Sequence, residues 1–333
     1  MRIEIVTTPN ENLKETGFGG IHACHAVLKV IVKMGYLVNL TVCRTEDDLD
    51  KIIARKPDLV VLAVKYVSID NDNDIWLSEY FMQHGINFTG SLKGTLEFDS
   101  NKILAKTYLQ NKGVATAKYF TTVPGQHSSE SELPIKFPLF LKPTDAANGN
   151  GIDDLSYVTS FSEFKNKVSS LYSLFNMPIL VEEYLDGREF TVAVIKKLDG
   201  EFIVSPIEIT PPESKHGLRI LGEKVKREDS EELKLIEDKE IMDNVKKLAI
   251  DSFIHLGVRD FGRIDIKANK SGEYFFLEAN LVPGMTPGSS YFPKSCEIEH
   301  GLAYDEVIKL ILQGAFYRAN LSLEKQSDLS FCM

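Results

Sequence analysis

Residues 260–290, DFGRIDIKANKSGEYFFLEANLVPGMTPGSS, decide the fold prediction. Apolar and polar residues alternate on both sides of 269–272, a pattern typical of two β-strands joined by a hairpin turn. Side chains two positions apart on a strand share one face of the sheet. Arg263 and Asp265 are therefore expected on one face of the first strand, and Glu278 and Asn280 on one face of the second.

The pairing of the two strands is expected to bring these polar side chains together. A turn at 269–272 sets Arg263 opposite Glu278, with Asp265 diagonal to it, at separations of about 5–8 Å. The other face then carries the apolar side chains, and Phe276 remains as the one apolar residue on the polar face.

The four polar residues suggest a metal and phosphate site. Asp265, Glu278 and Asn280 offer three oxygen ligands beside a guanidinium. Mg²⁺ prefers oxygen ligands and usually completes its coordination with water and phosphate. The cluster therefore suits Mg²⁺ that bridges the phosphates of a nucleotide. A salt-bridge cluster with a purely structural role is the alternative.

A second segment, ILVEEYLDGREFTVAVI at 179–195, combines an apolar strand with adjacent glutamates. Glu182 and Glu183 point to opposite faces of the strand, so only one of them can face solvent at low cost. The backbone from Glu183 through Tyr184 to Leu185 offers an adenine ring hydrogen-bond partners and an apolar slot, and Glu189 suits ribose hydroxyls. A solvated hairpin is the alternative.

The third segment, LFLKPTDAANGNGI at 139–152, places Lys142 at the end of a strand, before a loop of small and polar residues. Backbone N–H groups in such a loop can turn toward an anion, and the lysine adds a positive charge. The loop is not a P-loop, because the GKS or GKT ending is absent. An ordinary turn after a strand is the alternative.

Around these segments the chain changes character. Strands at 2–6, 37–42 and 59–64 alternate with helices at 22–34 and 45–55, which predicts a doubly wound parallel sheet. From about residue 180 onward β-strands dominate, with helices at 239–255 and 303–316. The predicted class is α/β, with α+β character in the C-terminal half. The predicted domains are 1–95, 96–180 and 181–320, followed by a peripheral tail at 321–333. The polar segment 210–232 is expected to be a functional loop.

Composition limits the class of partner. Of the 333 residues, 38 are Lys or Arg and 48 are Asp or Glu, a formal net charge of −10 that disfavours nucleic-acid and anionic-membrane binding. The apolar runs are shorter than the about 20 residues of a membrane span. Four scattered cysteines without a CxxC pair predict reduced thiols. We therefore expect a cytoplasmic protein with small-molecule partners. The composition does not decide whether it forms a homodimer.

In four blocks, in the same order, the chain resembles the D-alanine–D-alanine ligase branch of the ATP-grasp superfamily. The blocks are Lys142 before a small-residue loop, VEEYLDGREFTV at 181–192, GRID at 262–265, and LEANLVPGMT at 277–286. The resemblance implies an ATP-grasp fold over about residues 95–315, behind an N-terminal Rossmann-like domain. It also implies a carboxylate–amine ligase. ATP phosphorylates a carboxylate to an acylphosphate, an amine attacks it, and an amide or peptide bond forms as phosphate leaves.

The resemblance also implies roles for individual residues. Contacts to ATP would come from Lys102, Lys142, Asn148, Glu182, Glu183, Tyr184, Leu185 and Glu189. Two Mg²⁺ ions, or Mn²⁺ in their place, would be held by Asp265, Glu278 and Asn280. Transition-state charge would be stabilised by Arg263, by the backbone of Gly284 and by Lys224 of the mobile ω-loop, and Ser289 would bind the free carboxylate of a substrate.

On the substrate side, three positions differ from those of D-alanine ligases. The first-domain loop has no glutamate at Thr16 to Phe18, although Glu15 is close; Asn148 replaces a serine, and Val225 replaces a tyrosine. A site that lacks the partners of a polar substrate group binds that substrate poorly. We therefore expect an ATP-dependent ligase of amino acids whose carboxylate substrate is open. A genuine D-alanine–D-alanine ligase of cell-wall synthesis and a non-catalytic nucleotide-binding module are the alternatives.

Overall fold

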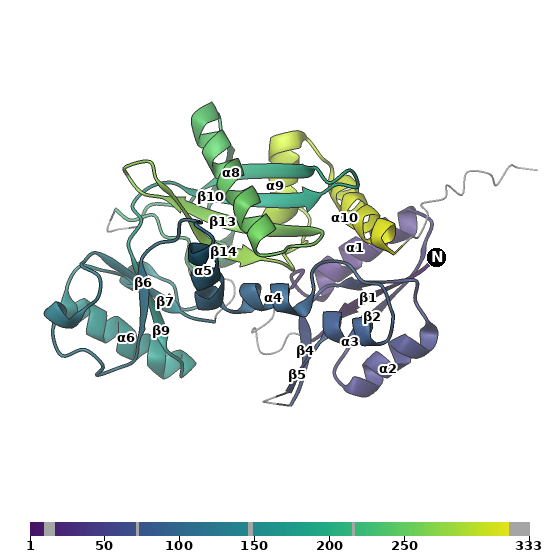
Figure 1. Ribbon diagram of the computed structural model, residues 1–333, viewed down its shortest axis with the longest axis horizontal. Coiled ribbons are helices and arrows are strands. Elements are labelled where there is room, and N and C mark those ends of the chain that lie inside the picture. Colours follow the sequence, from purple (N-terminus) through teal and green to yellow (C-terminus); the bar gives the residue numbers. More distant parts are fainter. Residues whose placement is uncertain (10–16, 71–72, 146–148, 215–216, 320–333) are drawn as a thin grey trace, which may run out of the picture.

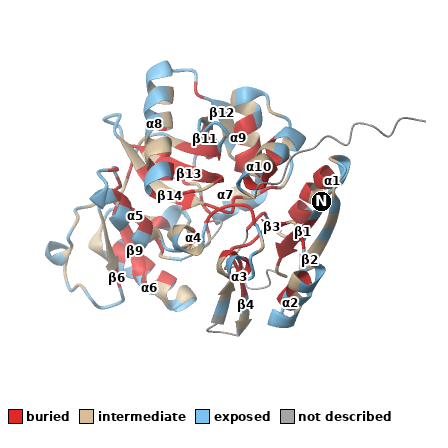
Figure 2. Ribbon diagram, turned by 45° about the vertical axis from the view of Figure 1, so that its right-hand side comes forward, coloured by how far each residue is buried: buried red, intermediate tan, exposed pale blue. Residues whose placement is uncertain are grey.

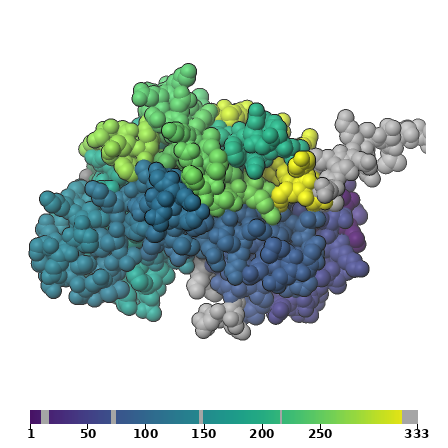
Figure 3. Space-filling model, in the orientation of Figure 1, coloured from purple at the N-terminus to yellow at the C-terminus, as the bar shows by residue number. Residues whose placement is uncertain are grey.

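The computed structural model describes residues 1–9, 17–70, 73–145, 149–214 and 217–319. Its three larger β-sheets follow one another along the chain (Figure 1). The predicted tail at 321–333 lies outside the described residues. Figure 3 shows the same three parts in space-filling form: the N-terminal residues at the lower right, the central residues at the left, and the later residues above both.

The N-terminal part contains a parallel three-stranded sheet with the order β2-β1-β3. It is built from β1 (Arg2–Thr7), α1 (Ile21–Lys33), β2 (Leu37–Val42), α2 (Glu46–Arg55) and β3 (Leu59–Leu62). The strand–helix alternation predicted from the sequence is therefore confirmed here. Thr45 caps α2, since its side chain accepts a hydrogen bond from the backbone N–H of Asp48.

The chain then leaves this sheet through a short hairpin and three helices. These elements are β4 (Tyr66–Asp70), β5 (Asn73–Trp76), α3 (Leu77–Gln83), α4 (Lys93–Ser100) and α5 (Lys102–Asn111). The chain is extended as far as Trp76, and only the part from Leu77 onward is helical.

The central part is an antiparallel four-stranded sheet with the order β6-β9-β7-β8, covered by one helix. The elements are β6 (Tyr119–Thr122), β7 (Leu139–Pro143), β8 (Tyr157–Val158), α6 (Phe161–Phe175) and β9 (Ile179–Glu183), with 3-10 turns at Glu130–Glu132 and Asp154–Ser156. Phe164, Val168 and Leu171 of α6 pack on Leu139 and Leu141, which gives this sheet its own apolar core.

The last part is an antiparallel five-stranded sheet with the order β12-β11-β10-β13-β14. Its strands are β10 (Glu189–Lys196), β11 (Phe202–Thr210), β12 (Glu232–Leu235), β13 (Phe261–Ala268) and β14 (Tyr274–Asn280). Its helices are α7 (Glu223–Glu228), α8 (Lys239–His255), α9 (Tyr291–His300) and α10 (Tyr304–Arg318). Figure 2 shows buried residues along these strands and exposed residues on the outer sides of α8 and α2.

The strands β13 and β14 pair in a register that differs from the predicted one. Arg263 pairs with Asn280 and Asp265 with Glu278. One position of this shift arises at the turn, because Ala268 pairs with Tyr274 and not with Glu273, and the second arises at a β-bulge between Asp265 and Ile266. An extra residue in one strand shifts the alternation of its side chains by one position. The prediction that Arg263 lies opposite Glu278 is therefore wrong, although all four polar residues still share one face.

The same bulge corrects the place of Phe276. This residue pairs with Ile266 and is fully buried in the core, whereas the sequence predicted it on the polar face. Leu277 is the extra residue, and it is only partly buried. The bulge thus puts Phe276 into the core and leaves Leu277 and Glu278 at the functional face.

Candidate functional site

Two adjoining clefts lie where the central sheet meets the five-stranded sheet. The apolar cleft is lined by Ala117, Phe140, Lys142, Ile152, Glu182, Glu183, Tyr184, Leu185, Glu189, Ile220, Leu221, Lys226, Asp265, Lys267, Leu277 and Glu278. The charged cleft has among its lining residues Lys65, Asp99, Lys102, Lys142, Lys226, Glu231, Arg263, Glu278, Asn280, Gly284, Ser289, Ser290 and Tyr291. Lys142, Lys226 and Glu278 line both clefts and so stand where they join.

The end of β9 forms one wall of the apolar cleft. All five residues expected at adenosine (Glu182, Glu183, Tyr184, Leu185 and Glu189) line this cleft. Tyr184 packs edge-on against Tyr157, with ring centroids 4.6 Å apart. Glu189 at the start of β10 forms an ion pair with Lys267, with 2.8 Å between Oε2 and Nζ.

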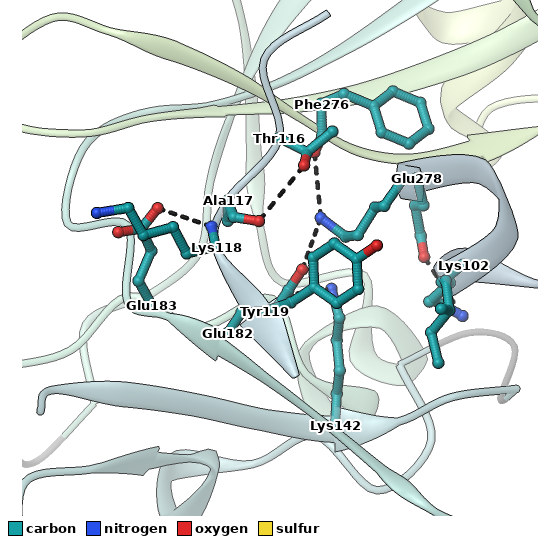
Figure 4. A network of polar contacts seen from close by, with 12 residues as sticks. Lys102, Thr116, Ala117, Lys118, Tyr119, Lys142, Glu182, Glu183, Phe276 and Glu278 are labelled. Atoms are coloured by element: carbon teal, nitrogen blue, oxygen red, sulfur yellow. Dashed lines mark hydrogen bonds and ion pairs between the residues drawn. The ribbon is translucent and has the colours of Figure 1, made fainter. Parts of the chain in front are cut away.

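The two adjacent glutamates of β9 have different surroundings, as their opposite faces predicted. Glu182 is 3% exposed, and its two carboxylate oxygens pair with two lysines: Oε1 with Lys106 at 2.6 Å and Oε2 with Lys142 at 2.7 Å. Figure 4 shows Glu182 and Lys142 in this group. Glu183 is half-buried, and its Oε1 accepts a hydrogen bond from the backbone N–H of Lys118. The negative charge of the buried Glu182 is therefore balanced by two lysines, whereas Glu183 is not fully buried.

The ion pairs among Glu182, Lys106 and Lys142 go with shifted pKa values in all three side chains. Burial alone would raise the pKa of Glu182, but Lys106 and Lys142 outweigh burial and lower it to about 2. Burial lowers the pKa of Lys106, against the attraction of Glu182. For Lys142, the attraction of Glu182 and Glu278 outweighs burial and raises the pKa. Glu182 is therefore a permanent anion at neutral pH.

The polar face of β13 and β14 holds Arg263 and Asp265 in a two-point ion pair. The Arg263 Nε and NH2 atoms donate to Oδ1 and Oδ2 of Asp265 at 3.0 and 2.9 Å. Thr191 Oγ donates to Oδ1 at 2.6 Å, and the Asn280 amide donates to Oδ2 at 3.1 Å. Both residues of the pair are buried, which fixes the guanidinium at the wall of the charged cleft.

Several positively charged side chains lie near the carboxylate of Glu278. Burial would raise its pKa, but Lys102, Lys226, Lys142 and Arg263 together lower it to about 2. Lys102 Nζ lies 3.6 Å from its Oε2 (Figure 4). Four cations therefore surround one carboxylate at the junction of the two clefts.

For the ω-loop lysine, the structure favours a residue other than the predicted one. Lys224 is exposed. Lys226, by contrast, lines both clefts, and its charge helps to lower the pKa of Glu278. Both lysines lie on the short helix α7, where two positions turn a side chain by more than half a turn. The other predicted residue of the nucleotide loop, Asn148, lies outside the described residues.

The glycine-containing turn after β7 lies directly against the start of α7. The backbone N–H of Glu223 donates to the carbonyl of Ile152 at 3.2 Å. A Cβ atom on Gly222 would lie 2.4 Å from that same carbonyl oxygen, so only glycine fits. The two segments thus close over the place where the clefts join.

The far wall of the charged cleft comes from the segment after β14. Gly284, Ser289, Ser290 and Tyr291 line it, and a Cβ on Gly284 would lie 2.7 Å from Ser290 Oγ. Ser290 Oγ in turn accepts a hydrogen bond from the backbone N–H of Thr286 at 2.9 Å. The predicted positions Gly284 and Ser289 are therefore both at the cleft.

Several residues at the site were not predicted from the sequence. Lys106, Glu231 and Tyr291 contact the predicted residues or line the clefts, but each belongs to a segment that carries no motif. The one available signal was Lys106 itself, an isolated lysine on the apolar side of a helix whose other buried residues are Ala105 and Leu109.

The donor set on the polar face fits a magnesium ion. Within the described part of the chain, no three His, Cys, Asp or Glu side chains gather closely enough to hold a metal by themselves. Two carboxylates and the amide oxygen of Asn280 would therefore need water and phosphate to complete the coordination, as Mg²⁺ commonly does. Asp265 already accepts four hydrogen bonds, so a bound cation would replace at least one of them.

In the part of the chain that the structure describes, no helix has the length and apolar character needed to cross a bilayer.

Comparisons with known proteins agree with this geometry. A family model described as "D-ala D-ala ligase C-terminus" matches residues 108–313. A D-alanine–D-alanine ligase of Aquifex aeolicus is 27% identical over 292 residues, which cover 86% of this chain and 92% of that protein. One from Marinomonas sp. is 28% identical over 235 residues, 70% of each chain.

Solved structures show the same fold. The D-alanine–D-alanine ligase from Bacillus anthracis, complexed with ATP, has a TM-score of 0.73 at 20% identity and covers 96% of this chain and 99% of its own. The VanG D-Ala:D-Ser ligase from Enterococcus faecalis has a TM-score of 0.70 at 19% identity, with coverage of 94% and 99%. The predicted ATP-grasp fold behind a Rossmann-like domain is thereby confirmed.

The family model spans well over half of the chain, and the fold and the order of the sequence blocks agree with it. The chain therefore belongs to the D-alanine–D-alanine ligase family, as an ATP-grasp ligase that forms an amide bond.

Proposed function

We propose that this ligase uses ATP to activate the carboxylate of an amino acid and joins it to the amine of a second one. The adenosine of ATP would occupy the apolar cleft, and its phosphates would reach into the charged cleft. D-alanine is the first substrate to test for both positions, because the relatives are named as D-alanine ligases.

The apolar cleft supports the adenosine part of this proposal. It combines the apolar side chains of Phe140, Leu185 and Leu277 with the backbone that follows Glu183. An adenine ring needs an apolar slot and hydrogen-bond partners at its edge. Glu189 lines the same cleft and is suited to bind ribose hydroxyls.

The cations at the junction support the phosphate part. Phosphoryl transfer depends mostly on positioning and on neutralising charge. Lys102, Lys142, Lys226 and Arg263 line the charged cleft together with Glu278 and supply four positive charges there. This convergence of four cations on Glu278 is the single observation that carries the proposal, because a structural ion pair would need only one or two of them.

A magnesium ion would be held by Asp265, Glu278 and Asn280. When bound, it would neutralise phosphate charge and orient the transferred group. The protein's own contribution is to hold these three ligands in place: β13 and β14 fix their backbones, and Thr191 fixes the Asp265 carboxylate.

The charged cleft would hold the reacting carboxylate and the amine. Arg263 is placed to stabilise the negative charge that develops on the acylphosphate and on the tetrahedral intermediate. The backbone N–H of Gly284 can donate to the same oxygen, and Ser289 can bind the free carboxylate of an amino acid. A binding module without catalysis would need none of this second set.

The experiment is a screen of amino acids for ADP release with ATP and Mg²⁺, with D-alanine included. We expect release that needs an amino acid and yields a dipeptide. Asp265→Asn should lower this turnover about 100-fold or more and leave the fold intact, whereas Asp199→Asn, a change at an exposed loop carboxylate, should have no effect. Unchanged turnover in the Asp265 variant would refute the metal assignment, and no amino-acid-dependent ADP release would refute the ligase proposal.

A further inference from the structure

Glu231 lines the charged cleft just before β12, at the end where Ser289 and Tyr291 also lie. Its Oε1 accepts a hydrogen bond from the Tyr291 hydroxyl. Its Oε2 is shielded from solvent and, within the described residues, has no hydrogen-bond partner. A buried carboxylate oxygen without a partner is unfavourable, so the arrangement calls for a donor that arrives from outside the protein.

Tyr291 ties this carboxylate to the reacting centre. Its ring lies under the Arg263 guanidinium, at 5.3 Å from the ring centroid, and only 9% of the tyrosine is exposed. Burial and Glu231 both raise the pKa of Tyr291, so its hydroxyl stays protonated and keeps donating to Glu231. The carboxylate is therefore held about one aromatic ring away from the guanidinium assigned to the acylphosphate.

The amine substrate of the ligase reaction is a suitable hydrogen-bond donor for the unpartnered oxygen of Glu231. An amino-acid amine is an ammonium group at neutral pH and has no lone pair with which to attack. It must lose a proton next to Arg263, which is itself a permanent cation and cannot accept one. Four other described carboxylates line this cleft. Asp99 is taken up by Lys65 and by the backbone N–H of Leu281, Glu278 pairs with Lys102 and is assigned to the metal, and Asp145 and Asp229 are exposed. The other titrating or charged side chains that line this cleft, among the described residues, are Lys65, Lys102, Lys142, Lys226, Arg263 and Tyr291.

We propose that Glu231, positioned by Tyr291, binds the ammonium group of the amine substrate and removes its proton; this rests on the ligase function proposed above. The ammonium transfers one proton to Glu231, and the nitrogen lone pair forms the C–N bond to the acylphosphate carbonyl carbon. The C–O bond to phosphate then breaks, and phosphate leaves with that electron pair and takes the second proton from nitrogen. The amide is complete, and Glu231 returns its proton to solvent.

The test compares two nucleophiles on one enzyme. D-alanine, or another amino acid that gives ADP release in the wild type, enters as an ammonium, whereas hydroxylamine is uncharged at neutral pH and needs no base. Glu231→Gln keeps the size of the side chain and an oxygen for Tyr291. We expect it to lower the kcat of dipeptide formation about 100-fold or more and to leave hydroxamate formation at the wild-type rate.

Two further variants sharpen the result. Tyr291→Phe keeps the ring under Arg263 but releases Glu231, and should also lower dipeptide formation selectively. Glu232→Gln, at the exposed neighbouring carboxylate that pairs with Lys234, should change neither product. In Glu231→Gln the dipeptide rate should rise about tenfold per pH unit as free amine accumulates, and its deficit should shrink at high pH.

The outcomes separate the two proposals. An equal fall of dipeptide and hydroxamate in Glu231→Gln, or no fall of either, would overturn the role of Glu231 while the ligase function stands. A wild type that forms neither product with any amino acid would overturn the ligase function, and this role with it.

Discussion

At the scale of single residues, Glu182 places one negative charge between two lysines in the protein interior. Removing one member of a buried ion group leaves the others uncompensated and commonly costs about 3–5 kcal/mol. Replacing Glu182 by Gln leaves Lys106, which is 0% exposed, and Lys142 without the carboxylate between them. We expect the free energy of unfolding at pH 7 to fall by about 3 kcal/mol, measured by denaturant titration.

The same carboxylate predicts a dependence on pH. Its pKa in the folded protein, about 2, lies below the ordinary value of 4.5, so folding favours the charged form. This contribution is fully present above pH 4.5 and is lost as the pH falls toward about 2. Stability of the wild type should therefore drop across this window more steeply than that of Glu182→Gln; parallel curves would contradict the pKa assignment.

Lys226 and Lys224 offer a matched pair of substitutions. A hydrogen bond to a charged group contributes about 1.5–3 kcal/mol, so Lys226→Met should lower kcat/KM for ATP about 10–100-fold. Lys224→Met, a change of the same size on the same helix, should leave it unchanged because that side chain is exposed. The reverse result would restore Lys224, the lysine that the family resemblance implies.

At the scale of elements, the close contact between α7 and the turn after β7 can be tested with a single added methyl group. An alanine at Gly222 would bring its Cβ to 2.4 Å from the Ile152 carbonyl and force the two segments apart. We expect Gly222→Ala to raise the KM for ATP several-fold and to speed proteolysis within 210–232. Gly94→Ala is the control, because its Cβ would meet nothing within 4 Å.

Proteolysis of the wild type should respond to ligand at the same place. If 210–232 closes over bound substrates, ATP with an amino acid should slow cleavage there in the wild type and much less in Gly222→Ala. Equal cleavage with and without ligand would show that this segment does not close.

How far the sequence predicts these elements depends on what each signal encodes. Alternation placed Glu182 and Glu183 on opposite faces and put Arg263, Asp265, Glu278 and Asn280 on one face, because period two is a local property of a strand. The predicted register is wrong by one position at the turn and by a second at Leu277, since a bulge adds one residue without changing composition. Lys226 was missed because α7 lies in a segment whose polar composition predicted a loop. Lys106 on α5 was missed because its partner, Glu182, lies on the distant strand β9, and such contacts are set only by the tertiary fold.

At the scale of the whole molecule, a group of charges joins the N-terminal part to the five-stranded sheet. The Arg259 guanidinium donates to the carbonyls of Gly90 and Phe88 at 2.6 and 3.2 Å, and Arg318 donates to Phe88 at 2.8 Å. Asp260 pairs with Arg318 and accepts from the backbone N–H of Gly90. Burial, followed by the repulsion of Arg318, lowers the pKa of Arg259 to about 10.

Asp260 is therefore the counterion on which this junction depends. Asp260→Asn leaves two arginines without it, and we expect the melting temperature to fall by several degrees. Asp305→Asn, at the exposed ion pair with Lys33, should leave it unchanged in the same calorimetric scan. A melting temperature equal to that of the wild type in both variants would show that the junction does not limit stability.

The wall of the charged cleft is shared between distant parts of the chain. The backbone N–H of Met285 donates to the carbonyl of Phe18, and the N–H of Phe18 donates to Ala63. Asp99 accepts from Leu281 in the same region. A chimera that imported residues 1–95 from a relative would therefore remodel the binding surface without touching a single ligase motif. Substrate preference in such chimeras would depend on how well the imported N-terminal part packs against the rest of the chain. Engineering a new preference would therefore require exchanging the contacting residues of both parts together.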